Sequence, residues 1–257
     1  METIYTADAL LLIYSFVVFL FIGSFLNVWA IRTLDGTSVL HPRHSHCPSC
    51  STLLTWRDLI PVLSWLFLRG RCRTCGEPIS WLYPLGELVS ALILTFIVWQ
   101  QGLSLETFVI LTLFVFILTL TMTDIRAKLM PNKITYPGLV VILLLRLFIH
   151  PLGLTDYGIG FFVGGALLTL LALVPNGMGG GDIKLFALIG LALGWQGVLF
   201  ALFYSCVWGT VFGLPLKWAG VIKPRQPIPF GPFILIGTLT AWAYGADIWD
   251  LYMQLYR

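Results

Sequence analysis

The chain has 257 residues, of which 58% are hydrophobic and only 11% are charged, and its mean hydropathy is +0.90. A soluble domain carries about a quarter charged residues, so this composition excludes a water-soluble globular protein. The net charge of +3 is too small to indicate a nucleic-acid partner.

The apolar runs of the chain predict helices that cross a membrane, because a spanning helix needs about 20 mostly apolar residues. The 184–218 run is long enough for two spans, with a break expected near Gly194–Gly197, although a single long bent helix is the alternative. The sequence thus predicts an all-α, multi-pass protein of about eight transmembrane helices. The runs lie near 9–31, 83–100, 105–123, 137–151, 158–175, 184–218 and 229–247.

The chain divides into a first transmembrane helix at 1–31, a polar insert at 32–81 and a membrane core at 82–257. With eight spans, every Lys and Arg except Arg146 and Arg257 falls on one side of the membrane. Basic loops mark the cytoplasmic side. We therefore expect the insert and the basic loops to be cytoplasmic and both termini to face outward.

The insert carries two CxxC pairs, Cys47–Cys50 and Cys72–Cys75, with 21 residues between them. Two such pairs can close a tetrahedral thiolate site around zinc. A polar segment of this size has little apolar mass of its own, so a metal gives it a reason to be ordered. Redox-active or unliganded thiols are the alternative. Three histidines just upstream are expected at the surface rather than as ligands: His41, His44 and His46.

Two aspartates are expected at the cytoplasmic ends of spans: Asp124 ends the third, and Asp182 follows the glycine run Gly179, Gly180 and Gly181. A carboxylate in such a place indicates function, since it is costly unless it faces a cavity or a partner. Two carboxylates that share a proton can supply one acid and one base to peptide hydrolysis. The alternatives are a solvated helix end for Asp124 and an N-terminal helix cap for Asp182.

An ordered set of motifs, covering nearly the whole chain, resembles the type IV prepilin peptidases. The G-x-G-D tetrad alone is weak, but the ordered set is specific. It comprises Gly23–Val28, both CxxC pairs, Asp58–Trp65, Ile79–Leu88, the segment from Asp124 to Pro131, Gly179–Asp182 and Pro229–Phe233.

The resemblance implies an aspartyl endopeptidase of the bacterial inner membrane, with Asp124 and Asp182 as its catalytic acids. Its substrates would be type IV prepilins and pseudopilins, which lose a short basic leader at the cytoplasmic face. The resemblance also implies methylation of the new N-terminus with S-adenosylmethionine. Asn27, Arg71 and Glu87 are candidate contacts for the substrate or the methyl donor, chosen by location and chemistry.

Two other classes of protein are compatible with parts of this pattern. A transporter would use intramembrane acids and Gly/Pro breaks, but it requires a polar path, and the acids here gather at one face. An assembly module would dock a partner through the insert, and this leaves the glycine run and Asp182 unexplained. The sequence does not indicate an oligomeric state.

Overall fold

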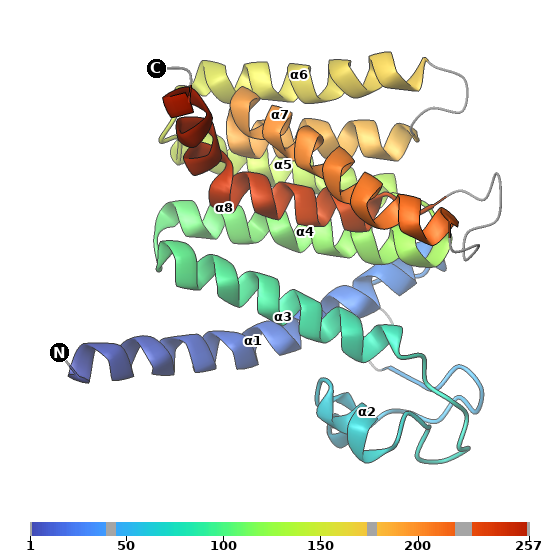
Figure 1. The fold of residues 1–257 in the computed structure, drawn as a ribbon. Coiled ribbons are helices and arrows are strands. Elements are labelled where there is room, and N and C mark those ends of the chain that lie inside the picture. The colour runs from blue at the N-terminus through green and yellow to red at the C-terminus, as the bar shows by residue number, and fades with distance from the viewer. Residues whose placement is uncertain (1, 40–44, 174–178, 219–227, 256–257) are drawn as a thin grey trace. The chain divides into compact units, whose positions relative to one another are not determined.

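The structure is a computed structural model that describes residues 2–39, 45–173, 179–218 and 228–255. Every regular element in these ranges is a helix, and the only extended pairings among them are two isolated bridges (Figure 1). The chain forms two compact units, Met1–Thr107 and Phe108–Arg257. The predicted all-α fold is confirmed.

The first unit is built on two helices, α1 (Glu2–Leu34) and α3 (Leu82–Gln101), which pack against each other. Gly23 lies against the Glu87 backbone, and the Asn27 amide donates to the Tyr83 carbonyl at 3.1 Å. Residues later in α1 thus meet residues earlier in α3, so the two helices run antiparallel. Between them, the described part of the insert holds two short helices, η1 (Trp56–Leu59) and α2 (Leu63–Phe67).

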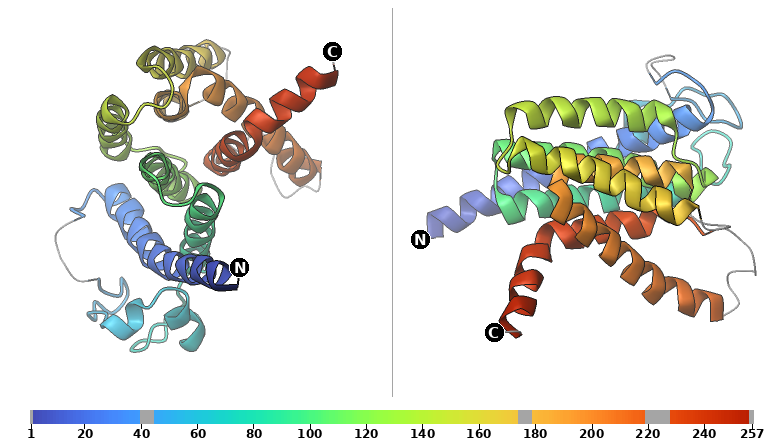
Figure 2. Two further views of the ribbon diagram at one scale, coloured as in Figure 1. Left: turned by 90° about the vertical axis from the view of Figure 1, so that its left-hand side faces the viewer. Right: turned by 90° about the horizontal axis from the view of Figure 1, so that it is seen from above.

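The second unit is a helical bundle organised around α7 (Gly180–Trp218), which packs against α5, α6 and α8 (Figure 2). Close approach of α6 and α7 needs glycine, because an added Cβ on Gly160 or Gly190 would collide with the backbone of the other helix. The remaining helices of this unit are α4 (Leu105–Ala127), α5 (Asn132–Phe148), α6 (Leu154–Ala172) and α8 (Gly231–Leu255).

The helix α7 breaks at Gly194, whose φ of 76° and ψ of 179° are not helical. This break frees backbone carbonyls, and Arg146 of α5 donates to one of them, the Ala192 oxygen, from Nε at 2.9 Å. The Arg146 side chain is only 2% exposed, and its guanidinium lies 4.4 Å from the centre of the Tyr157 ring. A cation is favourable at a helix C-terminus, so Arg146 caps the first half of α7.

The number of spans is not confirmed as eight. Among the described residues, five helices are long and apolar enough to cross a membrane, and the two runs expected within 184–218 form one of them. The helix α5, with 17 residues, falls just short of the usual length. The break at Gly194 lies where the sequence indicated it. The end of the fifth expected span, near 174–175, lies outside the described residues.

Candidate active site

Asp124 lies in the last turns of α4, and its side chain is almost entirely buried, with 7% exposed. The backbone N–H of Gly231, the first residue of α8, donates to its Oδ2 at 2.7 Å. In return, the hydroxyl of Thr121, one turn earlier in α4, donates to the Gly231 carbonyl at 3.3 Å. The start of α8 therefore fixes one carboxylate oxygen of Asp124.

Asp182 is half-buried in the first turn of α7, and Gly179 bonds it twice. Its N–H donates to the Gly179 carbonyl at 3.1 Å, and its carboxylate accepts the Gly179 N–H. The space beside Gly180 is open, whereas Gly181 packs tightly on Met130, so that a Cβ there would lie 2.7 Å from the Met130 Cβ. The glycine run thus shapes the loop around Asp182.

The two carboxylates belong to the same unit, and they lie close enough to interact electrostatically. Asp124 comes from the end of α4 and Asp182 from the start of α7, so residues 58 positions apart in the sequence lie near each other at one end of the bundle. Such a pair can share a proton, and it then offers one base and one acid to a bound peptide.

The sequence does not predict the hydrogen bond from Gly231 to Asp124, although Pro229–Phe233 stands out as a motif. A glycine followed by a proline is a common helix start, because proline is favoured in the first turn. That pattern marks the beginning of α8. It does not reveal that this helix end points at Asp124, since the two residues are 107 positions apart.

The four insert cysteines lie on two knuckles of the same construction. In the first, the Ser51 N–H donates to the Cys47 carbonyl at 2.9 Å; in the second, Gly76 donates to Cys72 at 3.0 Å. Both donors have a positive φ, 56° at Ser51 and 71° at Gly76. One strand-like bridge closes each knuckle. His46, in the first bridge, is exposed, and His41 and His44 lie outside the described residues.

The sulfurs of these cysteines fit a tetrahedral metal. All four Sγ atoms lie within 4.8 Å of one another, and those of Cys47 and Cys75 are 3.9 Å apart. Zinc–sulfur bonds of about 2.3 Å place the sulfurs of a tetrahedron about 3.8 Å apart. A hydrogen bond with the Thr52 side chain is the main cause that lowers the pKa of the Cys50 thiol to about 6, whereas burial and the neighbouring thiols raise the pKa of Cys75 to about 12, so the fit rests on the positions of the sulfurs. The residues therefore fit zinc, which needs thiolate ligands.

Two of the three remaining candidates, Asn27 and Glu87, are buried at the packed face of α1 and α3. The Glu87 carboxylate accepts the backbone N–H of Val62, from the insert, at 2.7 Å. Asn27 Oδ1 and the Ser90 hydroxyl are buried and have no hydrogen-bond partner among the described residues. Arg71 is exposed on the second knuckle and, among the described residues, makes no ion pair with Glu87.

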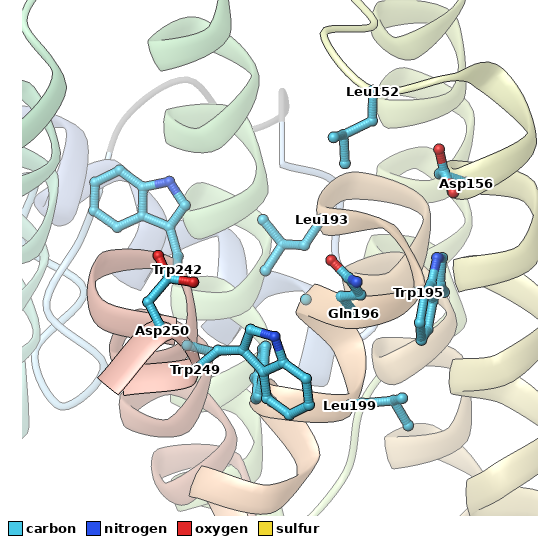
Figure 3. Close-up of a pocket in the computed structure, with 12 residues that line it drawn as sticks. Leu152, Asp156, Leu193, Trp195, Gln196, Leu199, Trp242, Trp249 and Asp250 are labelled. Carbon is cyan, nitrogen blue, oxygen red and sulfur yellow. The ribbon is translucent and has the colours of Figure 1, made fainter. Parts of the chain in front are cut away.

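The second unit also contains a cavity of about 810 Å³, whose lining residues are drawn in Figure 3. It is lined by the beginning of α6, the break in α7 and the end of α8, with Asp156, Trp195 and Asp250 among its residues. The first half of α7 separates it from Asp182, a distance of about 16 Å along the helix. The cavity is therefore not part of the aspartate site.

Comparisons with known proteins cover both units of the chain. Residues 17–101 match the model for the bacterial peptidase A24 N-terminal domain, and residues 111–214 match that for the type IV leader peptidase family. These two ranges fall within the two structural units. No solved structure matches the chain significantly.

Several curated relatives share the name prepilin leader peptidase/N-methyltransferase. One from Bacillus subtilis (strain 168) is 37% identical over 93% of this chain and 97% of its own length. One from Stutzerimonas stutzeri is 34% identical over 83% of this chain and 76% of its own length. One from Xanthomonas campestris pv. campestris is 31% identical over 91% of this chain and 92% of its own length. From the helical membrane fold, the four-cysteine insert and these matches, the chain belongs to the type IV leader peptidase family, the enzymes named prepilin leader peptidase/N-methyltransferase.

Proposed function

We propose that this chain removes the leader from type IV prepilins and pseudopilins by an aspartyl mechanism that uses Asp124 and Asp182. What supports the proposal is that these two carboxylates lie within electrostatic range at one end of the second unit, with Asp124 held by the Gly231 N–H. One carboxylate takes a proton from water as it attacks the peptide carbonyl. The other protonates the leaving amine.

The location of the pair suits a substrate with a transmembrane helix. Both aspartates lie at an end of an apolar helix long enough to span the membrane. A pilin helix lying beside these helices would present the peptide bond before its apolar segment at the same depth. The basic residues Arg126, Lys128 and Lys184 lie near this end, so the positive-inside rule favours a cytoplasmic site in the inner membrane.

The second proposed activity is methylation of the amine that the cleavage creates. S-adenosylmethionine would supply the methyl group. The insert-side face of α1 and α3 has the chemistry to hold a cationic amine or sulfonium, since Glu87 is a buried carboxylate and Asn27 Oδ1 is a buried acceptor with no partner in the part of the chain that the structure describes. Zinc, held by the four cysteines, has no open position and would be structural.

Cleavage of a prepilin-like protein in liposomes tests the aspartyl mechanism. We expect wild-type protein to cut the leader, and Asp124→Asn and Asp182→Asn each to lose cleavage while retaining their elution profile and zinc. Asp247→Asn is the matched control, because Asp247 is exposed on α8. Cleavage at the wild-type rate in both variants would refute the mechanism. No cleavage by folded wild type with several substrates would favour an assembly module instead.

Methylation is tested on the same products by mass spectrometry. With added S-adenosylmethionine, we expect the mass of the mature subunit to rise by one methylene. Glu87→Gln should reduce this methylation and weaken calorimetric binding of S-adenosylmethionine, while cleavage continues. Methylation and binding unchanged in Glu87→Gln would exclude the proposed role of this carboxylate.

A further inference from the structure

The insert exposes apolar side chains on its short helix α2. The exposed fractions are 50% for Leu63, 56% for Leu66 and 83% for Phe67. These three residues are called the α2 face below. Side chains of this size are seldom left together in water on a polar segment, so the α2 face needs an apolar environment.

The position of α2 along α3 indicates what that environment is. The N–H of Val62, the residue before α2, donates to the Glu87 carboxylate. Glu87 lies five residues after Leu82, where α3 begins, which is about 8 Å along the helix. The helix α2 therefore begins beside the second turn of an apolar spanning helix, and Figure 1 shows it next to the first turns of α3 rather than beyond them.

The packing of Trp65 turns the α2 face outward. The Trp65 indole N–H donates to the Ile79 carbonyl at 3.0 Å, and its ring lies against Gly70, where an added Cβ would be 2.8 Å away. This fixes the inward side of α2 toward the second knuckle. Leu66 and Phe67, its neighbours in sequence, consequently point away from the insert and remain exposed.

Exposed arginines flank the α2 face on both sides along the chain: Arg57 before it, and Arg69, Arg71 and Arg73 after it. Of these, Arg73 is neutralised by an ion pair with Asp58 at 2.8 Å. Apolar side chains beside exposed basic ones are typical of segments that lie in the interface of a membrane with anionic lipids.

We propose that the α2 face is immersed in the bilayer on the insert side, with Phe67 among the acyl chains and Arg69 at the phosphates of anionic lipids. The insert then contacts the membrane through α2, beside α3. Because the Val62 N–H donates to Glu87, lipid contact at α2 affects the environment of that carboxylate. The proposal requires neither the peptidase activity nor a particular orientation of the protein.

Photocrosslinking of the full-length protein in nanodiscs tests the proposal. The substitution Phe67→p-benzoylphenylalanine places the photoreactive group on the α2 face. The matched control is Ser49→p-benzoylphenylalanine, at an exposed position within the first knuckle. The nanodiscs contain equal amounts of phosphatidylglycerol and phosphatidylcholine, and zinc content and elution profile show that both variants are folded. Intact-protein mass spectrometry identifies the adducts.

We expect lipid adducts at position 67 and none at position 49. A basic residue near an anionic surface favours it by about fivefold, so phosphatidylglycerol adducts should exceed phosphatidylcholine adducts by about that factor. Adding Arg69→Gln should reduce the excess toward one. Crosslinked dimers in place of lipid adducts would overturn the proposal in favour of a second copy on this face. Equal labelling at both positions, or labelling of neither, would overturn it as well.

Discussion

Replacing Gly231 by alanine adds one methyl group, which should displace the Asp124 carboxylate without changing any charge. An alanine Cβ at 231 would lie 2.9 Å from Asp124 Oδ2 and 3.1 Å from its Cβ, whereas ordinary contacts begin at 3.4 Å. The carboxylate must therefore move by about half an ångström. Catalytic groups tolerate only about that displacement, and a shift of about 1 Å can cost about a hundredfold. We expect Gly231→Ala to lower kcat by about tenfold, which corresponds to about 1.4 kcal/mol.

The assay compares kcat and KM for cleavage of a prepilin-like substrate in liposomes. The control is Gly158→Ala in α6, which makes the same change where nothing lies within 4 Å. Both variants should keep their melting temperature, because each glycine lies in a helix and alanine suits a helix. A Gly231→Ala protein with wild-type kcat would refute the reasoning that the contact of Gly231 with Asp124 positions this carboxylate. A fall in melting temperature with unchanged kcat would likewise refute it.

Three further outcomes follow from the packing and the metal centre. Arg146→Met should lower the melting temperature, because the Ala192 carbonyl loses its buried donor at a cost of about 1–3 kcal/mol; a thermal unfolding series that includes Arg146→Lys, which should lose less, checks this. Gly190→Ala should prevent folding, judged by size-exclusion chromatography, since its Cβ would strike the Gly160 carbonyl. Zinc, measured by metal analysis, should be about one per chain, absent from Cys72→Ser, and lost in acid, because protons then compete with the metal for the four thiolates.

The fold class could be predicted from the sequence because a helix that spans a membrane requires a long run of mostly apolar residues. Apolar runs gave the positions of α3, α4 and α6 to within about four residues at each end, whereas α1 begins seven residues earlier than expected. They could not settle α7, because hydropathy is uninterrupted through Gly194 while the backbone is not. The capping of Ala192 by Arg146 at this break is a contact between distant parts of the chain, so no local pattern could have revealed it.

The four-cysteine site and the aspartate pair differ in how close their residues lie in the sequence. Each zinc knuckle is a short segment, so the spacing of the cysteines was enough to predict that four sulfurs meet, and the structure confirms it. The aspartate pair was inferred from helix ends and from resemblance, and its catalytic role stays a prediction. The bonds from Gly231 to Asp124 and from Val62 to Glu87 join separate elements, so no local pattern could have revealed them.

The break at Gly194 has a consequence for water. The half of α7 that carries Asp182 runs only from Gly180 to Leu193, about 21 Å at 1.5 Å per residue. The hydrocarbon layer of a bilayer is about 30 Å thick. A helix this short is accommodated by local thinning of the membrane or by burial of its end. Thinning at the Asp182 end would bring the headgroup layer closer to the aspartates. Water for hydrolysis would then reach the site through this locally thinned region of the bilayer.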